Sequence, residues 1–342
     1  MKYSPLVWLL IVGFLIACFK DPRPQETAKG PFRLTQTISM PNVKGRLDHM
    51  DVDVKGKRLF VAGLENGTLE VVDLQSGSWM RSIPGFKKPQ GVLFVPTLNK
   101  LFVASGDDGM LRVFNGDTLG LLDSIHLEAG PNRVVYEPHS QLVYVGYGGK
   151  DAGKDYGEVG VVDARSDKHI DDITVAAHPS ELLLNQSGTK LFVFISIDNQ
   201  VQVVDTDKRE VVSTWKVSSE RPGDAAFDEL ASRLYIGTRT PPEMIVMDAL
   251  SGKEIFHVAT AEGMDGVYFD RQRKRIYVSG GRELPDGFVY IYQQHADHYE
   301  LLGRIQTRSG AGTSLWSSEL DRYFVAAPAN AKQNAAILVY AP

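Results

Sequence analysis

Cysteine is almost absent from this chain, which has a single one, Cys18, among 342 residues. One thiol cannot form an internal disulfide, so no disulfide framework holds the fold together. Stability must therefore come from a packed core, and an apolar content of 43% is sufficient for one. A chain of this length can bury one large core or two ordinary ones, and composition alone does not decide between them.

Basic runs, helical periodicity and familiar catalytic motifs are also lacking. The 37 Lys and Arg residues are outnumbered by 42 Asp and Glu residues, for a net charge of -5, so no nucleic-acid partner is expected. The chain has no G-x-S-x-G nucleophile motif. The segment from Gly148 to Asp155 approaches a phosphate-binding loop, but Asp155 replaces the required Ser or Thr. No local motif therefore indicates an enzyme class.

The N-terminus has the pattern of an export signal. Lys2 supplies a positive charge, and the twelve residues from Leu6 to Ala17 are apolar, too few for the about twenty that span a bilayer. The run ends in Leu-Ile-Ala-Cys, which resembles the lipobox of bacterial lipoproteins, where the cysteine is acylated. We therefore interpret residues 1–17 as a lipoprotein signal peptide and Cys18 as the lipidation site. An ordinary signal peptide with a chance cysteine and an uncleaved membrane anchor are the alternatives.

Residues 18–31 are expected to form a flexible tether between the lipid and the folded domain, because they combine prolines with charges of both signs. The protein is then exported to the bacterial cell envelope and touches the membrane through its lipid alone. It faces the periplasm or the cell surface. Phe19 occupies the position where an aspartate retains lipoproteins in the inner membrane of enteric bacteria, which favours the outer membrane.

One strand pattern recurs seven times. Its apolar core is followed by a turn rich in Gly, Asn or Asp and then by a second apolar segment such as LEVVDL or VQVVDT. Alternation with period two, β-branched residues and turn residues predict strands. The mean spacing of the copies is about 44 residues, as expected for blades of four strands. The seven cores are RLFVAG at Arg58, KLFVAS at Lys100, QLVYVGY at Gln141, KLFVFI at Lys190, RLYIGT at Arg233, RIYVSG at Arg275 and RYFVAA at Arg322.

These repeats predict an all-β, seven-bladed β-propeller of four-stranded antiparallel blades over residues 32–342. The seventh copy stops after its third strand, at the C-terminus, and lacks an outer strand. The segment from Phe32 to Ile38 precedes the first copy and has the character of the missing strand. We expect this N-terminal strand to complete the last blade and close the ring.

The paired segments resemble the YVTN-repeat propellers, a family that includes YncE-like periplasmic proteins and surface-layer repeats. Six second strands match the aliphatic-aromatic-Val/Ile pattern, whereas Tyr323 departs by placing Tyr first. The Asp that closes the third strand is present at four positions, where it is most simply a turn-former: Asp73, Asp163, Asp205 and Asp248. The resemblance implies recognition or scaffolding as readily as chemistry.

A candidate site follows from the topology of a blade. Loops from second to third strands emerge on the same face as the residues that precede each innermost strand, and the longest insertions fall in these loops. Polar groups should therefore converge around one end of the central channel, which we name the channel mouth. Its candidate ligand-binding residues are Asp48, His49, Gln90, Asn132, Arg133, His178, Glu181, Asp224, Asp265 and Thr313.

The chemistry of this set is mixed. His49, His178, Glu181, Asp224 and Asp265 can ligate a divalent cation, and Arg133 can hold an anionic group. No other cofactor is expected. The alternative is a wet, polar channel whose side chains cap strands and hold water.

We favour a monomeric binding or scaffold module that recognises a small ligand, a polymer or an envelope protein. The rival is a hydrolase of lactonase type, since some seven-bladed propellers are lactonases. In that scheme His49 or Glu181 is the base and Arg133 steadies the developing oxyanion. A purely structural surface protein is a third reading, which predicts that every mouth substitution is tolerated.

The lipid anchor is tested by replacing Cys18 with Ser. Without the thiol no acyl chain is attached, so the variant is expected in the soluble fraction after cell lysis, whereas the wild type stays with membranes. Fractionation with immunoblotting measures this distribution. Membrane association that is unchanged in Cys18→Ser would contradict the anchor.

Overall fold

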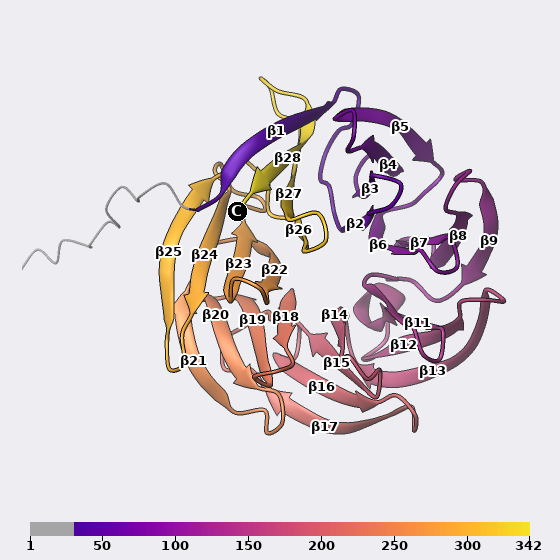
Figure 1. Cartoon of the computed structure of the whole chain (residues 1–342). Helices are drawn as coiled ribbons and strands as arrows, with labels where there is room; N and C mark the ends of the chain where they lie inside the picture. The colour runs from indigo at the N-terminus through magenta and orange to yellow at the C-terminus, as the bar shows by residue number, and fades with distance from the viewer. Residues whose placement is uncertain (1–30) are drawn as a thin grey trace, which may run out of the picture.

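The computed structural model describes residues 31–342, which form seven four-stranded antiparallel sheets arranged in a ring (Figure 1). The predicted all-β, seven-bladed β-propeller is therefore confirmed. The signal peptide, Cys18 and the tether up to residue 30 lie outside the described residues. No helix in the described part of the chain has the length and apolarity needed to cross a bilayer.

Six blades run outward from the channel in sequence order, and the seventh does so except for its outermost strand, β1 (Arg33–Met40). The innermost strands are β2 (Met50–Asp53), β6 (Pro89–Val95), β10 (Val134–Glu137), β14 (Pro179–Leu184), β18 (Ala225–Asp228), β22 (Met264–Asp270) and β26 (Ser314–Ser317). The second strands are β3 (Arg58–Gly63), β7 (Lys100–Ser105), β11 (Leu142–Gly148), β15 (Lys190–Ile195), β19 (Arg233–Arg239), β23 (Arg275–Gly280) and β27 (Arg322–Ala327). They are the recurring apolar cores of the sequence, and they are almost wholly buried.

The outer half of each blade carries the solvent-facing surface. The third strands are β4 (Thr68–Asp73), β8 (Met110–Asn115), β12 (Tyr156–Asp163), β16 (Gln200–Asp205), β20 (Pro242–Asp248), β24 (Phe288–Gln294) and β28 (Ala335–Ala341). The outermost strands are β5 (Ser78–Pro84), β9 (Leu121–His126), β13 (Lys168–Ala176), β17 (Glu210–Lys216), β21 (Glu254–Ala259), β25 (Tyr299–Gln306) and β1 (Arg33–Met40). Alternating exposed and half-buried residues in β17 show how one face packs inward while the other meets water.

The ring is closed by the N-terminal strand, as the sequence predicts. Strand β1 pairs antiparallel with β28, in a register that runs from Arg33 opposite Ala341 to Met40 opposite Ala335 (Figure 1). Phe32 precedes this strand and packs its ring 4.6 Å from that of Tyr277 and 5.1 Å from that of Tyr323. The start of the propeller is thus bound to its last two blades.

Apolar side chains from neighbouring blades form seven core clusters, one at each junction. The cluster between the last and first blades combines Ile38 of β1, Val61 of β3 and Phe324 of β27. Because each blade packs against its two neighbours, the hydrophobic effect stabilises the ring as a closed series of interfaces.

The aspartates that close third strands form turns, which confirms their predicted role. The Asp73 carboxylate accepts the backbone N–H groups of Gln75 at 2.7 Å and Ser76 at 3.1 Å. Asp248 accepts those of Leu250 and Ser251 in the same way. These bonds lower the pKa of Asp73, since they favour the charged carboxylate. These aspartates therefore have a structural role.

The segment that approaches a phosphate-binding loop has a different structure. Gly149–Ala152 form a single 3-10 turn, and the chain then enters strand β12. A phosphate-binding loop needs a helix N-terminus at this point. The segment is therefore an enlarged loop between second and third strands, and it brings Asp151 to the channel mouth.

Candidate functional site

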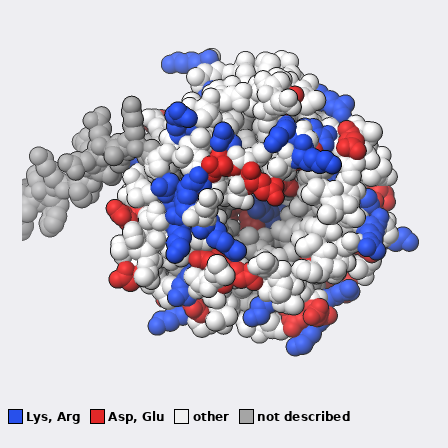
Figure 2. Space-filling model, in the orientation of Figure 1, with Lys and Arg blue, Asp and Glu red and all other residues white. Residues whose placement is uncertain are grey.

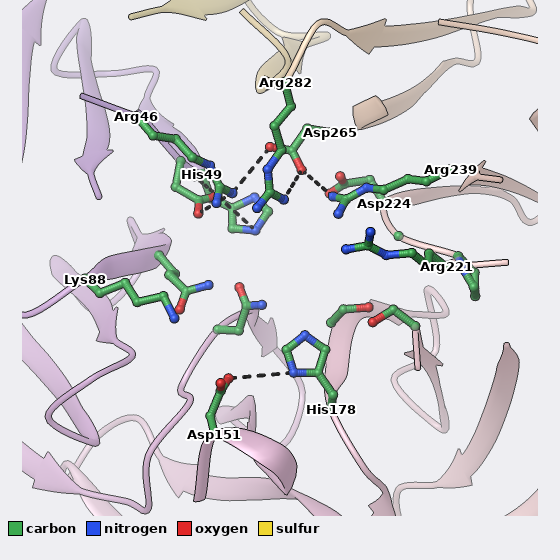
Figure 3. A pocket seen from close by; sticks show the side chains of 17 residues that line it. Arg46, His49, Lys88, Asp151, His178, Arg221, Asp224, Arg239, Asp265 and Arg282 are labelled. Carbon is green, nitrogen blue, oxygen red and sulfur yellow. Dashed lines mark hydrogen bonds and ion pairs between the residues drawn. The ribbon is translucent and has the colours of Figure 1, made fainter. Parts of the chain in front are cut away.

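A cavity of about 210 Å³ occupies the channel mouth (Figure 3). Figure 2 shows the hollow at the centre of the ring, with acidic and basic side chains gathered around it. Seven of the predicted residues line the cavity: Asp48, His49, Gln90, Asn132, His178, Asp224 and Asp265. The predicted concavity is therefore present, and these seven residues lie at or just before the start of innermost strands.

Three predicted residues do not line this cavity. Thr313 is buried, and its hydroxyl donates a hydrogen bond to Asp265 Oδ2 at 3.0 Å. Arg133 Nε lies 2.8 Å from Glu181 Oε1. Glu181 is only 1% exposed. These residues support the mouth from beneath, where a ligand in the cavity does not reach them directly.

Sequence reasoning missed most of the cations at the mouth. Arg239 ends strand β19 and Arg282 stands in the β23–β24 loop, and the insertions after these second strands were a usable signal. Arg46 stands in an irregular segment before the predicted Asp48, so nothing in the repeat pointed to it. Arg221 precedes a proline, as the predicted His178 does, and this shared feature was a signal. The overlooked lining side chains with polar groups are Arg46, Lys88, Asp151, Ser180, Ser196, Arg221, Arg239 and Arg282.

Asp265 is the centre of a cluster of guanidinium groups. Its carboxylate lies 3.0 Å from Arg239 Nη2 and 3.6 Å from both Arg46 Nη2 and Arg282 Nη1 (Figure 3). Burial alone would raise the pKa of Asp265, but the three guanidiniums outweigh it and hold the pKa below its usual value. Arg46 also pairs with Asp48 at 3.0 Å and Arg282 with Glu283 at 3.5 Å, so three guanidiniums share three carboxylates at this side of the cavity.

The opposite side of the cavity carries Lys88, His178 and Arg221 (Figure 3). Lys88 lies 3.5 Å from Asp107, an exposed and therefore weak pair. His178 Nδ1 lies 3.7 Å from Asp151 Oδ2. Burial lowers the pKa of His178, which favours its neutral form. Arg221 makes no ion pair within residues 31–342. Its guanidinium is therefore available to a ligand.

A buried chain of three side chains supports the mouth. Arg133 Nη1 lies 2.9 Å from His49 Nδ1, and Arg133 Nε contacts Glu181. A guanidinium only donates, so Nδ1 accepts and the ring proton resides on Nε2, 3.6 Å from Asp48 Oδ1. Burial together with the charge of Arg133 lowers the pKa of His49 to about 4. His49 is consequently a neutral imidazole near pH 7.

Burial favours the neutral acid at Glu181. It raises the pKa of this residue well above the usual range, and Asp224, which shares a hydrogen bond with Glu181, raises it further. Burial also raises the pKa of Asp48 and of Asp51 to about 6. The interior of the channel thus holds carboxyl groups that take up protons in the mildly acidic range.

The residues proposed as cation ligands do not come together as one set. Within residues 31–342, no group of three or more His, Cys, Asp and Glu side chains is placed to hold a metal ion. Asp265 is surrounded by guanidiniums, and His178 lies on the other side of the mouth from His49 (Figure 3).

Comparisons with known proteins support the fold and add one relative. No family model matches the chain. Over 174 residues it is 24% identical to "Antigen Lp49" of Leptospira interrogans serogroup Icterohaemorrhagiae serovar copenhageni (strain Fiocruz L1-130). That alignment covers 47% of this chain and 37% of the antigen, so it spans less than half of either protein.

Among solved structures, the chain is similar to "Kuenenia stuttgartiensis Hydrazine Synthase". The TM-score is 0.71 at 16% sequence identity, and the match covers 83% of this chain and 94% of the other. An identity this low supports the propeller fold alone.

The neutral state of His49 makes a pH-dependent prediction. The folded pKa of about 4 lies below the ordinary 6.5, so the unfolded state binds more protons between these values. The stability that His49 contributes is present above pH 6.5 and is lost as pH falls through 4. Relative to His49→Asn, we expect the wild type to lose about 2 to 3 kcal/mol between pH 7 and pH 4.

Urea denaturation of both proteins at the two pH values measures this difference. The amide oxygen of Asn can still accept from Arg133, so the variant is expected to fold. His126→Asn, an exposed position on β9, is the matched control and should follow the wild type. Parallel pH dependence of the wild type and His49→Asn would show that His49 titrates normally.

Proposed function

We propose that the protein is a lipid-anchored propeller of the bacterial envelope that binds a small ligand at the channel mouth without transforming it. The N-terminal lipobox pattern and the resemblance of its repeats to YVTN propellers support this location. The similarity to a protein named as an antigen points the same way, because it suggests a surface or envelope protein. Attachment to the outer membrane, and a monomeric state, belong to the same proposal.

The observation that carries the proposal is the convergence of polar and charged groups from six blades on one cavity. The lining runs from Arg46 in the first blade to Arg282 in the sixth. Its volume of about 210 Å³ is below the roughly 300 to 1,000 Å³ of sites for drug-sized molecules. A small, polar ligand fits this description better than a polymer or a protein segment, which would need a longer groove.

A thermal-shift screen tests ligand binding at the mouth. The screen uses small carboxylates, phosphates, sugars, amines and divalent cations. Because binding to the folded state stabilises it, we expect at least one class to raise the melting temperature of the wild type. Ser196→Trp fills the mouth from the β15–β16 loop and should abolish this shift. Ala296→Trp, in the exposed β24–β25 turn, is the bulk-matched control and should retain it.

A shift that Ser196→Trp and Ala296→Trp retain equally would place the ligand elsewhere and refute the proposal. The absence of any shift in the wild type would do the same. If only an envelope protein or polymer binds, and Ser196→Trp does not affect it, the top face acts as a scaffold through its loops.

The second candidate is a hydrolase of lactonase type. The specific observation in its favour is that Arg133 contacts both His49 and Glu181, so that the three side chains are linked through Arg133. The raised pKa of Glu181 favours the protonated acid, so the base in such a scheme is the neutral His49. His49 Nδ1 accepts from Arg133, so this scheme requires Arg133 to release that nitrogen before His49 can take up a proton. Hydrolysis of a six-membered lactone that is lost in His49→Asn would favour the enzyme over the binding module.

A further inference from the structure

A residue with left-handed backbone geometry precedes the innermost strand of every blade. In four blades this residue is a glycine, which adopts such geometry without steric cost: Gly45 (φ 70°), Gly130 (φ 93°), Gly263 (φ 59°) and Gly310 (φ 72°). In the second, fourth and fifth blades it is Lys88 (φ 60°), His178 (φ 67°) and Arg221 (φ 57°). One position of the repeat is therefore glycine in four blades and a long polar residue in the other three.

These three side chains share more than their backbone geometry. Each precedes a proline, in Lys88-Pro89, His178-Pro179 and Arg221-Pro222, and proline further restricts the residue before it. Gly130-Pro131 in the third blade has the same form with glycine. Glycine is thus compatible with this turn, and the backbone does not require the larger residues.

Lys88, His178 and Arg221 also share their location at the channel mouth. Fifteen non-glycine residues of the described chain have positive φ, and most of them stand in hairpin turns such as Asn99 and Ser232. Of the fifteen, Lys88, His178 and Arg221 are the ones that line the channel mouth. Strained backbone that persists at a cavity is a marker of function, because the surrounding fold must compensate for its cost.

The charges of the cavity indicate the kind of ligand. Five Lys or Arg side chains and four Asp side chains line the cavity, so positive charge is in slight excess. Asp265 serves three guanidiniums and Asp48 pairs with Arg46 at 3.0 Å, whereas Asp151 lies 3.7 Å from the neutral His178 and Asp224 has no ion-pair partner in the described chain. Lys88 and Arg221 reach into the cavity from different blades, and Arg221 also has no ion-pair partner there (Figure 3). Arg221, together with Lys88, whose only ion-pair partner in the described chain is the exposed Asp107, is therefore the cation most open to a ligand.

We propose that Lys88, His178 and Arg221 form a three-pronged site for a small anion with at least two negative charges, of the carboxylate or phosphate class. The proposal rests on the proposed function, since it names the ligand class of the same mouth. Arg221 supplies a planar fork that matches the oxygens of a carboxylate or phosphate. Lys88 adds a compact point charge, and His178 donates or accepts through its ring nitrogens.

Glycine substitution separates binding from folding at these positions. Lys88→Gly, His178→Gly and Arg221→Gly remove the prongs and relieve the left-handed strain, so we expect melting temperatures that are unchanged or slightly raised. Isothermal titration with succinate, inorganic phosphate, acetate and glucose measures binding. The wild type should bind succinate or phosphate at least tenfold more tightly than acetate. Each single variant should weaken that binding fivefold or more, and the triple variant should abolish it.

Lys274→Gly is the matched control, because Lys274 also has left-handed geometry (φ 51°) but does not line the mouth. It should bind as the wild type does. Preference for succinate over phosphate, or the reverse, assigns the carboxylate or the phosphate class. Dianion binding that the triple variant retains would overturn the proposal, as would the absence of dianion binding in the wild type.

The two proposals fail in different ways. A ligand that Ser196→Trp excludes but the triple glycine variant still binds would leave the mouth as a binding site and overturn the three-pronged anion site. A mouth that no compound in the screen occupies would overturn both. Melting temperatures that fall sharply in the glycine variants would show that the three side chains hold the fold together, which also contradicts the proposal.

Discussion

Pairing of the first strand with the last is the constraint on which the rest of the molecule depends. Strand β1 supplies the outer strand of a blade whose other strands come from the C-terminal end of the chain. Each blade packs only on its neighbours, so an open ring would leave two apolar faces in water. Closure removes these faces and fixes the seven blades around one axis. Residues far apart in sequence, such as Arg46 and Arg282, then come to share one carboxylate.

Closure also decides the electrostatics of the channel mouth. A guanidinium near a protein surface is tolerated when an acid lies close by, and here three of them share Asp265. Positive charge is in slight excess at the cavity, with five Lys or Arg side chains against four Asp side chains, and Arg221 has no acidic partner in the described chain. Beneath it, burial keeps His49 neutral and favours the protonated form of Glu181, whereas Arg133 remains charged. In our proposal this excess of positive charge attracts an anionic ligand.

The sequence was sufficient for the fold because each strand has a local signal. Alternating apolar residues and turn-forming Gly, Asn and Asp define β3 and β4, and repetition gives the number of blades. Even the closing strand was predictable, since the last copy lacks its outer partner. The face of the site followed from topology, which places the residues before each innermost strand beside the enlarged loops.

The details of the site were less accessible, for physical reasons. The contact of Arg133 with both His49 and Glu181 joins three blades, and no local pattern encodes which side chains meet across the channel. Arg46 and Arg221 stand in irregular segments, where periodicity carries no information. The recurrence of a proline after Lys88, His178 and Arg221 was a visible signal, but only the backbone angles show that these residues occupy a place suited to glycine.

The most direct test of the central claim is a high-resolution crystal structure of the wild type grown with succinate or phosphate. The account predicts an anion in the channel mouth, with its oxygens within hydrogen-bond distance of the Arg221 guanidinium and of Lys88 Nζ. A mouth that holds only water, while the anion is absent or bound on another face, would contradict it.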